Sequence, residues 1–226
     1  MKRLCVLLPA KDEAVGIGKT VKSILQAGVL PADVYVIDDG SSDGTGEIAA
    51  SFGVNVARNP KNIGKAHSLA RLASVFDLVH RYDYICLMDA DTQVSEDYFQ
   101  AVMSSFSEPG VAVVCGRAKS TPHNWLTAYR CLAYWISHAI YKDGQSNMGV
   151  ITVTPGCAAA FRADVFAQLE WSSDTIVETW TAPFKSIARN WARLSTRSAP
   201  WSPPRTPERF ATTSSRCIAG IPAPGR

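Results

Sequence analysis

The feature that most constrains this chain is a set of short apolar runs, each followed directly by acidic residues. Residues 3–10 (RLCVLLPA), 33–38 (DVYVID) and 82–89 (YDYICLMD) have the length and continuous hydrophobicity of strands buried on both faces. Segments with apolar residues at helical spacing lie between them, including one from 65 to 79. This alternation predicts an α/β fold: a doubly wound, mostly parallel sheet with helices on both faces.

The acidic residues follow the strands at the edge where such a sheet binds ligands. Glu13 follows the first strand, Asp38 and Asp39 end the second, and Asp89 and Asp91 follow the third. Ligands of doubly wound sheets lie outside the carboxyl ends of the strands. We therefore expect these carboxylates to converge on one site.

Asp89-Ala90-Asp91 indicates a metal site. Two carboxylates two residues apart, directly after an apolar strand, can share one hard divalent cation. Mg²⁺ or Mn²⁺ suits such oxygen ligands and commonly bridges to substrate phosphates. The alternative is a turn that merely uses aspartates, because D-x-D is a common pattern.

Three further loops carry candidate binding residues. Residues 38–42 (DDGSS) could accept hydrogen bonds from a nucleobase imide or a ribose hydroxyl, or form a tight turn rich in Asp, Gly and Ser. Residues 9–13 (PAKDE) end the first strand in the same way, and a helix-capping acid is the alternative there. In residues 62–66 (NIGKA), Gly64 permits close backbone approach and Lys65 could meet a diphosphate, or be a solvated lysine.

One motif resembles a phosphate-binding loop and is rejected. Residues 16–20 (GIGKT) look like the end of a P-loop, but G-x-x-x-x-G-K-T needs glycine where Glu13 stands. A carboxylate there would oppose phosphate, and Lys19 fits the solvent face of a helix. An ATPase and a non-enzymatic interaction module remain the alternative functions.

Composition separates a C-terminal segment from the rest of the chain. Residues 179–226 hold eight Lys and Arg against one acid, Glu208, and seven of the 13 prolines. We predict a folded domain over 1–178 and an irregular tail over 179–226, either disordered or out of frame. A basic nucleic-acid or membrane-binding arm is the alternative.

Six scattered cysteines without a CxxC pair indicate reduced thiols in the cytosol, and no run reaches the roughly 18 apolar residues of a membrane helix.

In order and spacing, these pieces resemble the family 2 glycosyltransferases, which have the GT-A (Rossmann-like) fold. The matching segments are LLPAKDE, VIDDGSSDGT, NPKNIGKAHSL, LMDADTQVSEDYF and TPGCAAAFRADVF. TPGCAAAFR followed by DTIVE is similar to the membrane-associated branch of cellulose, chitin and hyaluronan synthases. The resemblance covers about residues 1–178, with a nucleotide-sugar part over 1–118 and an acceptor side over 119–178.

The resemblance implies an inverting transfer from a nucleotide-diphospho-sugar, a UDP-sugar, to a glycan or lipid acceptor. It implies Mg²⁺ or Mn²⁺ as cofactor, no nucleic acid, and a cytoplasmic location, at the cytosolic face of a membrane in a full-length relative. Asp39 would contact the base, Lys65 the uridine or the diphosphate, and Asp89 the ribose or the diphosphate. Asp91, with Asp89, would ligate the metal. The implied substrate-binding residues are Pro9, Ala10, Glu13, Asp38, Asp39, Lys65, Asp89 and, on the acceptor side, Pro155, Gly156 and Cys157.

The chain departs from the family where the catalytic base belongs. The family places an aspartate after a glutamate, but here Glu178 is followed by Thr179, and threonine cannot act as the general base. The later Gln-x-x-Arg-Trp motif is also missing. We therefore expect little or no transferase activity from this polypeptide.

A shifted reading frame after Glu178 accounts for both losses. Suppose that each original codon consisted of the last base of one present codon and the first two bases of the next. The pair Trp180-Thr181 (TGG-ACN) then contains the codon GAC, which encodes aspartate, and the pair Trp191-Ala192 contains GGC, which encodes glycine. The degenerate positions permit Glu-Asp-Met-Asp after Val177 and Gln-Val-Tyr-Arg-Trp near residues 215–220. A one-base deletion within GAG-GAC would produce the observed Glu-Thr.

Overall fold

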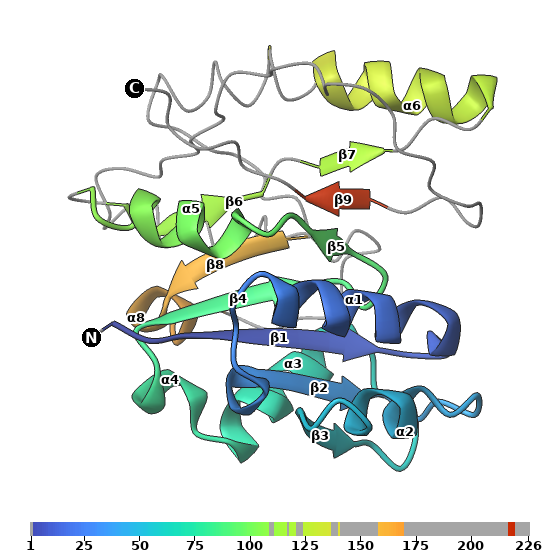
Figure 1. Cartoon of the computed structure of the whole chain (residues 1–226). Helices are drawn as coiled ribbons and strands as arrows, with labels where there is room; N and C mark the ends of the chain where they lie inside the picture. Colours follow the sequence, from blue (N-terminus) through green and yellow to red (C-terminus); the bar gives the residue numbers. More distant parts are fainter. Residues whose placement is uncertain are drawn as a thin grey trace.

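The computed structural model describes residues 2–108, 111–116, 118–120, 124–136, 140, 158–169 and 217–219. Strands and helices alternate along it, as the sequence predicts (Figure 1). In chain order the elements are β1 (Leu4–Ala10), α1 (Ala14–Gln26), the 3-10 helix η1 (Pro31–Asp33), β2 (Val34–Asp38), α2 (Thr45–Ala50), β3 (Asn55–Arg58), α3 (Lys65–Val75), α4 (Leu78–Arg81), β4 (Tyr84–Met88), β5 (Gln93–Val94), α5 (Tyr98–Ser105), β6 (Val113–Cys115), β7 (Ala118–Ser120), α6 (Trp125–Ile136), β8 (Ala158–Arg162), α8 (Ala163–Phe166) and β9 (Cys217–Ala219).

The main sheet has six strands in the order β3-β2-β1-β4-β8-β6. The pairs β1–β2, β1–β4 and β2–β3 are parallel, whereas β8 runs antiparallel to both of its neighbours, β4 and β6. Because β2, β1 and β4 are parallel, their carboxyl ends lie at one edge of the sheet. The strand order reverses at β1, which has β2 on one side and β4 on the other. This confirms the predicted doubly wound, mostly parallel fold.

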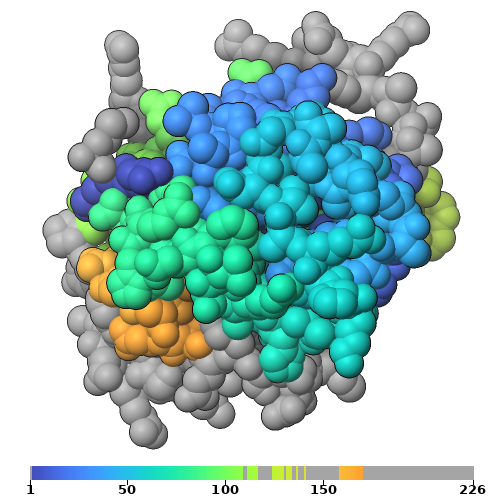
Figure 2. Space-filling view, turned by 90° about the horizontal axis from the view of Figure 1, so that it is seen from below, coloured from blue at the N-terminus to red at the C-terminus, as the bar shows by residue number. Residues whose placement is uncertain are grey.

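Alternate residues of the central strands supply two separate cores. In β1, Val6 and Leu8 face the core that α1, α2 and α5 cover, while Cys5 and Leu7 face the core that α3, α4 and α8 cover. All four side chains are fully buried. The second face brings together α4 and α8, which are distant in sequence and pack side by side (Figure 2). Burial on both faces explains why these strands read as continuous apolar runs.

The segment from 65 to 79, predicted as one helix, forms two. Helix α3 ends at Val75, and α4 begins only after Asp77, whose φ of 50° lies in the left-handed region. An aspartate tolerates that conformation better than most residues. The break lets α4 turn its apolar Leu78 into the second core, where it is fully buried.

A second, three-stranded sheet has the order β5-β9-β7. Its central strand, β9, lies within 179–226, the segment predicted as irregular. A strand can form there because its pairing with β5 and β7 uses backbone groups, which every sequence has. The rest of 179–226 lies outside the described residues, and its assignment as a disordered or out-of-frame tail stays a prediction.

The described cysteines are free thiols. Cys5, Cys86 and Cys115 are buried in β1, β4 and β6, and Cys131 is half-buried in α6. Burial raises the pKa of Cys86 to about 12, so that thiol remains protonated at neutral pH. Among the described residues, no helix has the length and the apolar run needed to cross a bilayer.

Candidate functional site

The loops that follow β1, β2 and β4 meet the start of α3 at one edge of the sheet. They enclose a cleft of about 400 Å³. The cleft is lined by Pro9, Ala10, Lys11, Glu13, Asp39, Asn62, Gly64, Lys65, Asp89, Ala90 and Asp91. The structure thus brings together Lys65 and acidic residues from three strand ends, as the sequence predicts.

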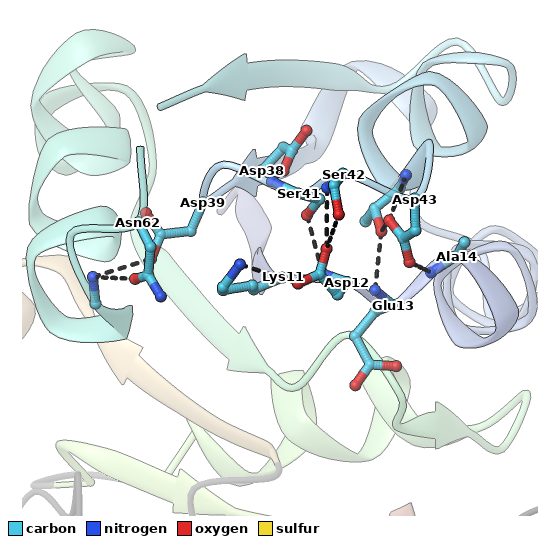
Figure 3. Close-up of polar contacts among 12 residues, drawn as sticks. Lys11, Asp12, Glu13, Ala14, Asp38, Asp39, Ser41, Ser42, Asp43 and Asn62 are labelled. Carbon is cyan, nitrogen blue, oxygen red and sulfur yellow. Dashed lines mark hydrogen bonds and ion pairs between the residues drawn. The ribbon is translucent and has the colours of Figure 1, made fainter. Parts of the chain in front are cut away.

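Hydrogen bonds join the loop after β1 to the loop after β2 (Figure 3). The backbone N–H of Asp12 donates to Ser41 Oγ at 3.0 Å, and the Asp12 carboxylate accepts from the N–H of Ser42 at 2.9 Å. Asp12 has a φ of 51°, in the left-handed region. These reciprocal bonds hold the strained residue in place and fix one loop against the other.

A second pair of bonds continues this brace into α1 and α2. The N–H of Glu13 donates to Thr45 Oγ1 at 2.8 Å, and the N–H of Ala14 donates to the Asp43 carboxylate at 2.9 Å. Asp43 thereby satisfies a backbone donor at the N-terminus of α1 that has no partner within the helix. Figure 3 shows the Glu13 side chain pointing away from these bonds.

Asp38 does not line the cleft, although the sequence predicts a contact with substrate. Its side chain is fully buried, where Oδ1 accepts from the N–H of Ser41 at 2.8 Å and Oδ2 lies 3.3 Å from Arg58 Nε. A Cβ on Gly46 would approach Asp38 Oδ2 to 2.7 Å, so only glycine fits there without a shift. The geometry gives Asp38 the role of positioning the β2 loop.

Asp39 does line the cleft, and it also fixes the loop before α3. Its carboxylate accepts from Asn59 Nδ2 at 2.7 Å and from the N–H groups of Ile63 and Gly64 at 2.9 Å each. Burial raises the pKa of Asp39, but the hydrogen bonds outweigh burial and the net pKa is lowered. Asp39 is therefore a carboxylate at neutral pH.

Lys65 and Asp89, which both line the cleft, form an ion pair of 2.7 Å from Nζ to Oδ1. Both side chains are partly exposed, at 24% and 34%. No hydrogen bond or ion pair joins the Asp91 side chain to any described residue, and Asp91 faces the same cleft. Two accessible carboxylates with a lysine beside them suit a divalent cation that is shared with phosphate oxygens.

The described residues contain no group of three His, Cys, Asp or Glu that could hold a metal alone. A Mg²⁺ ion normally completes its shell with water and substrate phosphates, so the pair Asp89 and Asp91 fits such a site. Pro155, Gly156, Cys157, Glu178 and Thr179 lie outside the described residues, and their assigned roles stay predictions.

The P-loop alternative fails on secondary structure. Gly16, Gly18 and Lys19 lie within helix α1, whereas a phosphate-binding loop must precede its helix. The sequence pattern does not indicate the roles of Asp12, Asp43, Asn59 and Arg58, which hold the loops. Asp43-Gly-Thr45 at the start of α2 is the one local signal for such a role, because Asp and Thr favour helix N-termini.

Comparison with known proteins places the chain in one family. The family model described as "Glycosyl transferase family 2" matches residues 5–170. Chitin synthase 5 of Pyricularia oryzae is 31% identical over 107 residues, which are 46% of this chain and 6% of that protein. Chitin synthase 4 of Gibberella zeae is 32% identical over 84 residues, 36% of this chain and 7% of that protein. The chain thus spans less than a tenth of these relatives.

Two solved structures share the fold. A mannosyltransferase of Pyrobaculum calidifontis, in complex with GDP-Man and Mn²⁺, has a TM-score of 0.65 and 18% identity, over 96% of this chain and 56% of that one. Glucosyl-3-phosphoglycerate synthase of Mycobacterium tuberculosis, in complex with Mn²⁺, UDP and glucosyl-3-phosphoglycerate, has a TM-score of 0.59 and 15% identity, over 97% of this chain and 71% of that one.

Proposed function

This chain belongs to glycosyl transferase family 2, and from that premise we propose that its cleft binds a UDP-sugar together with Mg²⁺ or Mn²⁺. The observation that carries the proposal is the convergence of Asp39, Lys65, Asp89 and Asp91 on one cleft of about 400 Å³. That volume is within the usual range for small-molecule sites. The solved relatives hold GDP-Man or UDP with Mn²⁺, which supports this class of ligand.

Each side chain has a role that its surroundings support. The Asp39 carboxylate lines the cleft and would accept a hydrogen bond from the imide N–H of a uracil, beside the hydrogen bonds that the protein donates to it. Asp91 and Asp89 would hold the cation, which supplies charge stabilisation to a departing diphosphate. Lys65 Nζ, held 2.7 Å from Asp89, would add a positive charge beside that diphosphate.

Titration calorimetry on the folded chain tests this proposal. We expect UDP to bind with Mn²⁺ present and to bind far more weakly with a chelator. Lys19→Ala should leave the affinity unchanged, because Lys19 lies on helix α1 outside the cleft. GDP and dTDP, titrated in parallel, establish which base the cleft selects. The proposal fails if a folded sample shows no metal-dependent binding of any of the three.

We further propose that this polypeptide transfers sugar slowly or not at all, because Thr179 stands where the base belongs. General-base assistance is worth about 10²–10⁴ in rate.

We infer that residues from Thr179 onward are read in a shifted frame. Inserting one base after the Glu178 codon should give a longer open frame with Glu-Asp and Gln-x-x-Arg-Trp, and a product that turns over a UDP-sugar. Turnover by the present chain at about 1 s⁻¹ would contradict the proposal of slow transfer. Absence of such an open frame in the coding DNA would contradict the proposed shift of reading frame.

A further inference from the structure

Asn62 is the only uncharged polar side chain among the described residues that line the cleft. It is exposed and lies in the loop between β3 and α3. The charged side chains of the cleft suit a cation and phosphate groups, as described above. An amide carries both a hydrogen-bond donor and an acceptor without a net charge. Asn62 therefore suits a neutral polar part of the ligand, such as a nucleobase.

One backbone N–H fixes the orientation of this amide. The N–H of Gly64 donates to Asn62 Oδ1 at 2.8 Å and also to Asp39 Oδ2 at 2.9 Å. With the amide turned over, the Asn62 NH2 group would oppose the N–H of Gly64, and two donors would meet. The amide oxygen of Asn62 is thus used within the loop. Its NH2 group has no hydrogen-bond partner among the described residues and is available to a ligand.

The Asn62 amide lies beside the Asp39 carboxylate, because both accept from the same N–H (Figure 3). The cleft therefore presents an acceptor and a donor next to each other. A base that carries an N–H next to a C=O matches this pair. Uracil and thymine have N3–H beside O4, and guanine has N1–H beside O6. Cytosine and adenine have the reverse order, a ring nitrogen that accepts beside an NH2 group that donates.

The loops that carry the two groups are held against each other. The Asp39 carboxylate accepts from the N–H groups of Ile63 and Gly64, which join the β2 loop to the loop before α3. Gly40 has a φ of 71°, and a Cβ there would come within 2.9 Å of the backbone nitrogen of Asn62. The donor and the acceptor are therefore in place before a ligand arrives, which lowers the cost of ordering them on binding.

We propose that Asn62 is a specificity-determining residue of the nucleotide cleft, whose NH2 group donates to the base carbonyl next to the N–H that Asp39 accepts. This inference rests on the proposed function and adds the class of nucleotide to it. The cleft accepts UDP, dTDP and GDP and disfavours CDP and ADP. With cytosine, the accepting N3 would meet the Asp39 carboxylate and the NH2 group would meet the Asn62 NH2 group, so both contacts would be repulsive.

Calorimetric titration of the full chain with UDP and CDP tests the proposal, because these ligands differ only at positions 3 and 4 of the base. With Mn²⁺ present, we expect wild type to bind UDP at least about tenfold more tightly than CDP. Asn62→Asp keeps an oxygen for the N–H of Gly64 but replaces the donor with an acceptor. It should lower the ratio of UDP affinity to CDP affinity by about tenfold. A role confined to the turn with Gly64 would leave this ratio unchanged.

Lys61→Gln is the matched control for charge. It lowers the net charge by one, as Asn62→Asp does, at the adjacent residue, which is not among those that line the cleft. Any repulsion between added negative charge and the diphosphate affects UDP and CDP alike, so Lys61→Gln should leave the ratio of their affinities unchanged. Circular dichroism establishes that each variant is folded.

The outcomes separate this inference from the proposed function. Equal affinity of folded wild type for UDP and CDP overturns the inference without the need for any variant. An unchanged ratio in folded Asn62→Asp also overturns it, while metal-dependent UDP binding by wild type leaves the proposed function in place. Absence of metal-dependent binding of every nucleotide overturns both.

Discussion

The carboxylates after β1 and β2 differ from those after β4, although all belong to acidic loops at one edge of the sheet. Asp12, Asp38, Asp39 and Asp43 are engaged by hydrogen bonds or ion pairs within the protein. Among the described residues, Asp91 has no such bond, and the side chain of Asp89 pairs only with Lys65, which lines the same cleft. The first group therefore braces the loops of the site, with Asp39 alone of these four also lining the cleft, whereas Asp89 and Asp91 are available to a ligand.

The difference shows that residue type and strand position alone do not reveal what an aspartate does. Asp38 and Asp39 are neighbours, yet Asp38 is fully buried against Arg58 and Asp39 reaches the cleft. In a parallel sheet, successive side chains at a strand end point to opposite faces. Asp39 therefore faces the site, whereas the Asp38 carboxylate points into the protein and pairs there with Arg58.

The largest effect should come from the β4 loop. Asp91→Asn should weaken metal-dependent UDP binding by about 100-fold, because it removes the proposed direct ligand of the cation. The same variant should keep its free energy of unfolding within about 0.5 kcal/mol of wild type, since no described residue bonds to that side chain. Calorimetry and urea denaturation measure the two quantities. A large loss of stability would place Asp91 with the structural group.

The opposite result is expected in the β2 loop. Asp39→Ala should reduce the free energy of unfolding by about 3 kcal/mol, because Asn59 and two backbone N–H groups lose a charged acceptor. Asp39→Asn keeps one acceptor oxygen and should recover part of that loss. Urea denaturation of the two variants tests this. Equal stability of Asp39→Ala and wild type would break the distinction between the two groups.

Crowding beside Asp38 offers a test of smaller size. Gly46→Ala should cost about 1–3 kcal/mol, because the new Cβ would meet the buried Asp38 Oδ2 at 2.7 Å. Gly18→Ala, in helix α1, is the matched control. Its Cβ would meet only ordinary contacts at 3.5 Å or more, and it should be neutral or stabilising by up to about 1 kcal/mol. Thermal unfolding of both variants gives the comparison.

The smallest effect is a dependence of stability on pH. The pKa of Asp39 is lower in the folded protein than its ordinary value, so its stabilising contribution is present above about pH 4. That contribution is lost as the pH falls through the lowered value, where the folded carboxylate takes up a proton. Asp39→Asn should therefore lose less stability than wild type between about pH 5 and pH 3. If the free energy of unfolding falls equally steeply with pH in the two proteins, Asp39 does not titrate in this way.

The periodicity of the chain predicts the parallel strands and the edge that holds the site, because a strand buried on both faces is a continuous apolar run in the sequence. It does not predict that β8 runs antiparallel between β4 and β6, since strand order depends on contacts distant in sequence. The sequence also indicates which acids gather at the site, but not that Asp12 would adopt a left-handed φ to brace Ser41 and Ser42. Such roles follow from loop geometry, for which the chain carries little periodic signal.

The position of β8 has a consequence for synthesis of the protein. Strand β8 lies between β4 and β6 and follows both in the sequence; Ala158 of β8, for example, pairs with Met88 of β4. The edges of β4 and β6 that β8 will cover therefore stay unpaired until β8 has been synthesised. Until then the nascent chain exposes two unpaired strand edges, which favour aggregation and chaperone contact. All six strands of the main sheet lie before Glu178. The proposed change of reading frame after Glu178 would therefore leave every strand of the main sheet intact, and the nascent domain could complete that sheet before the later residues emerge.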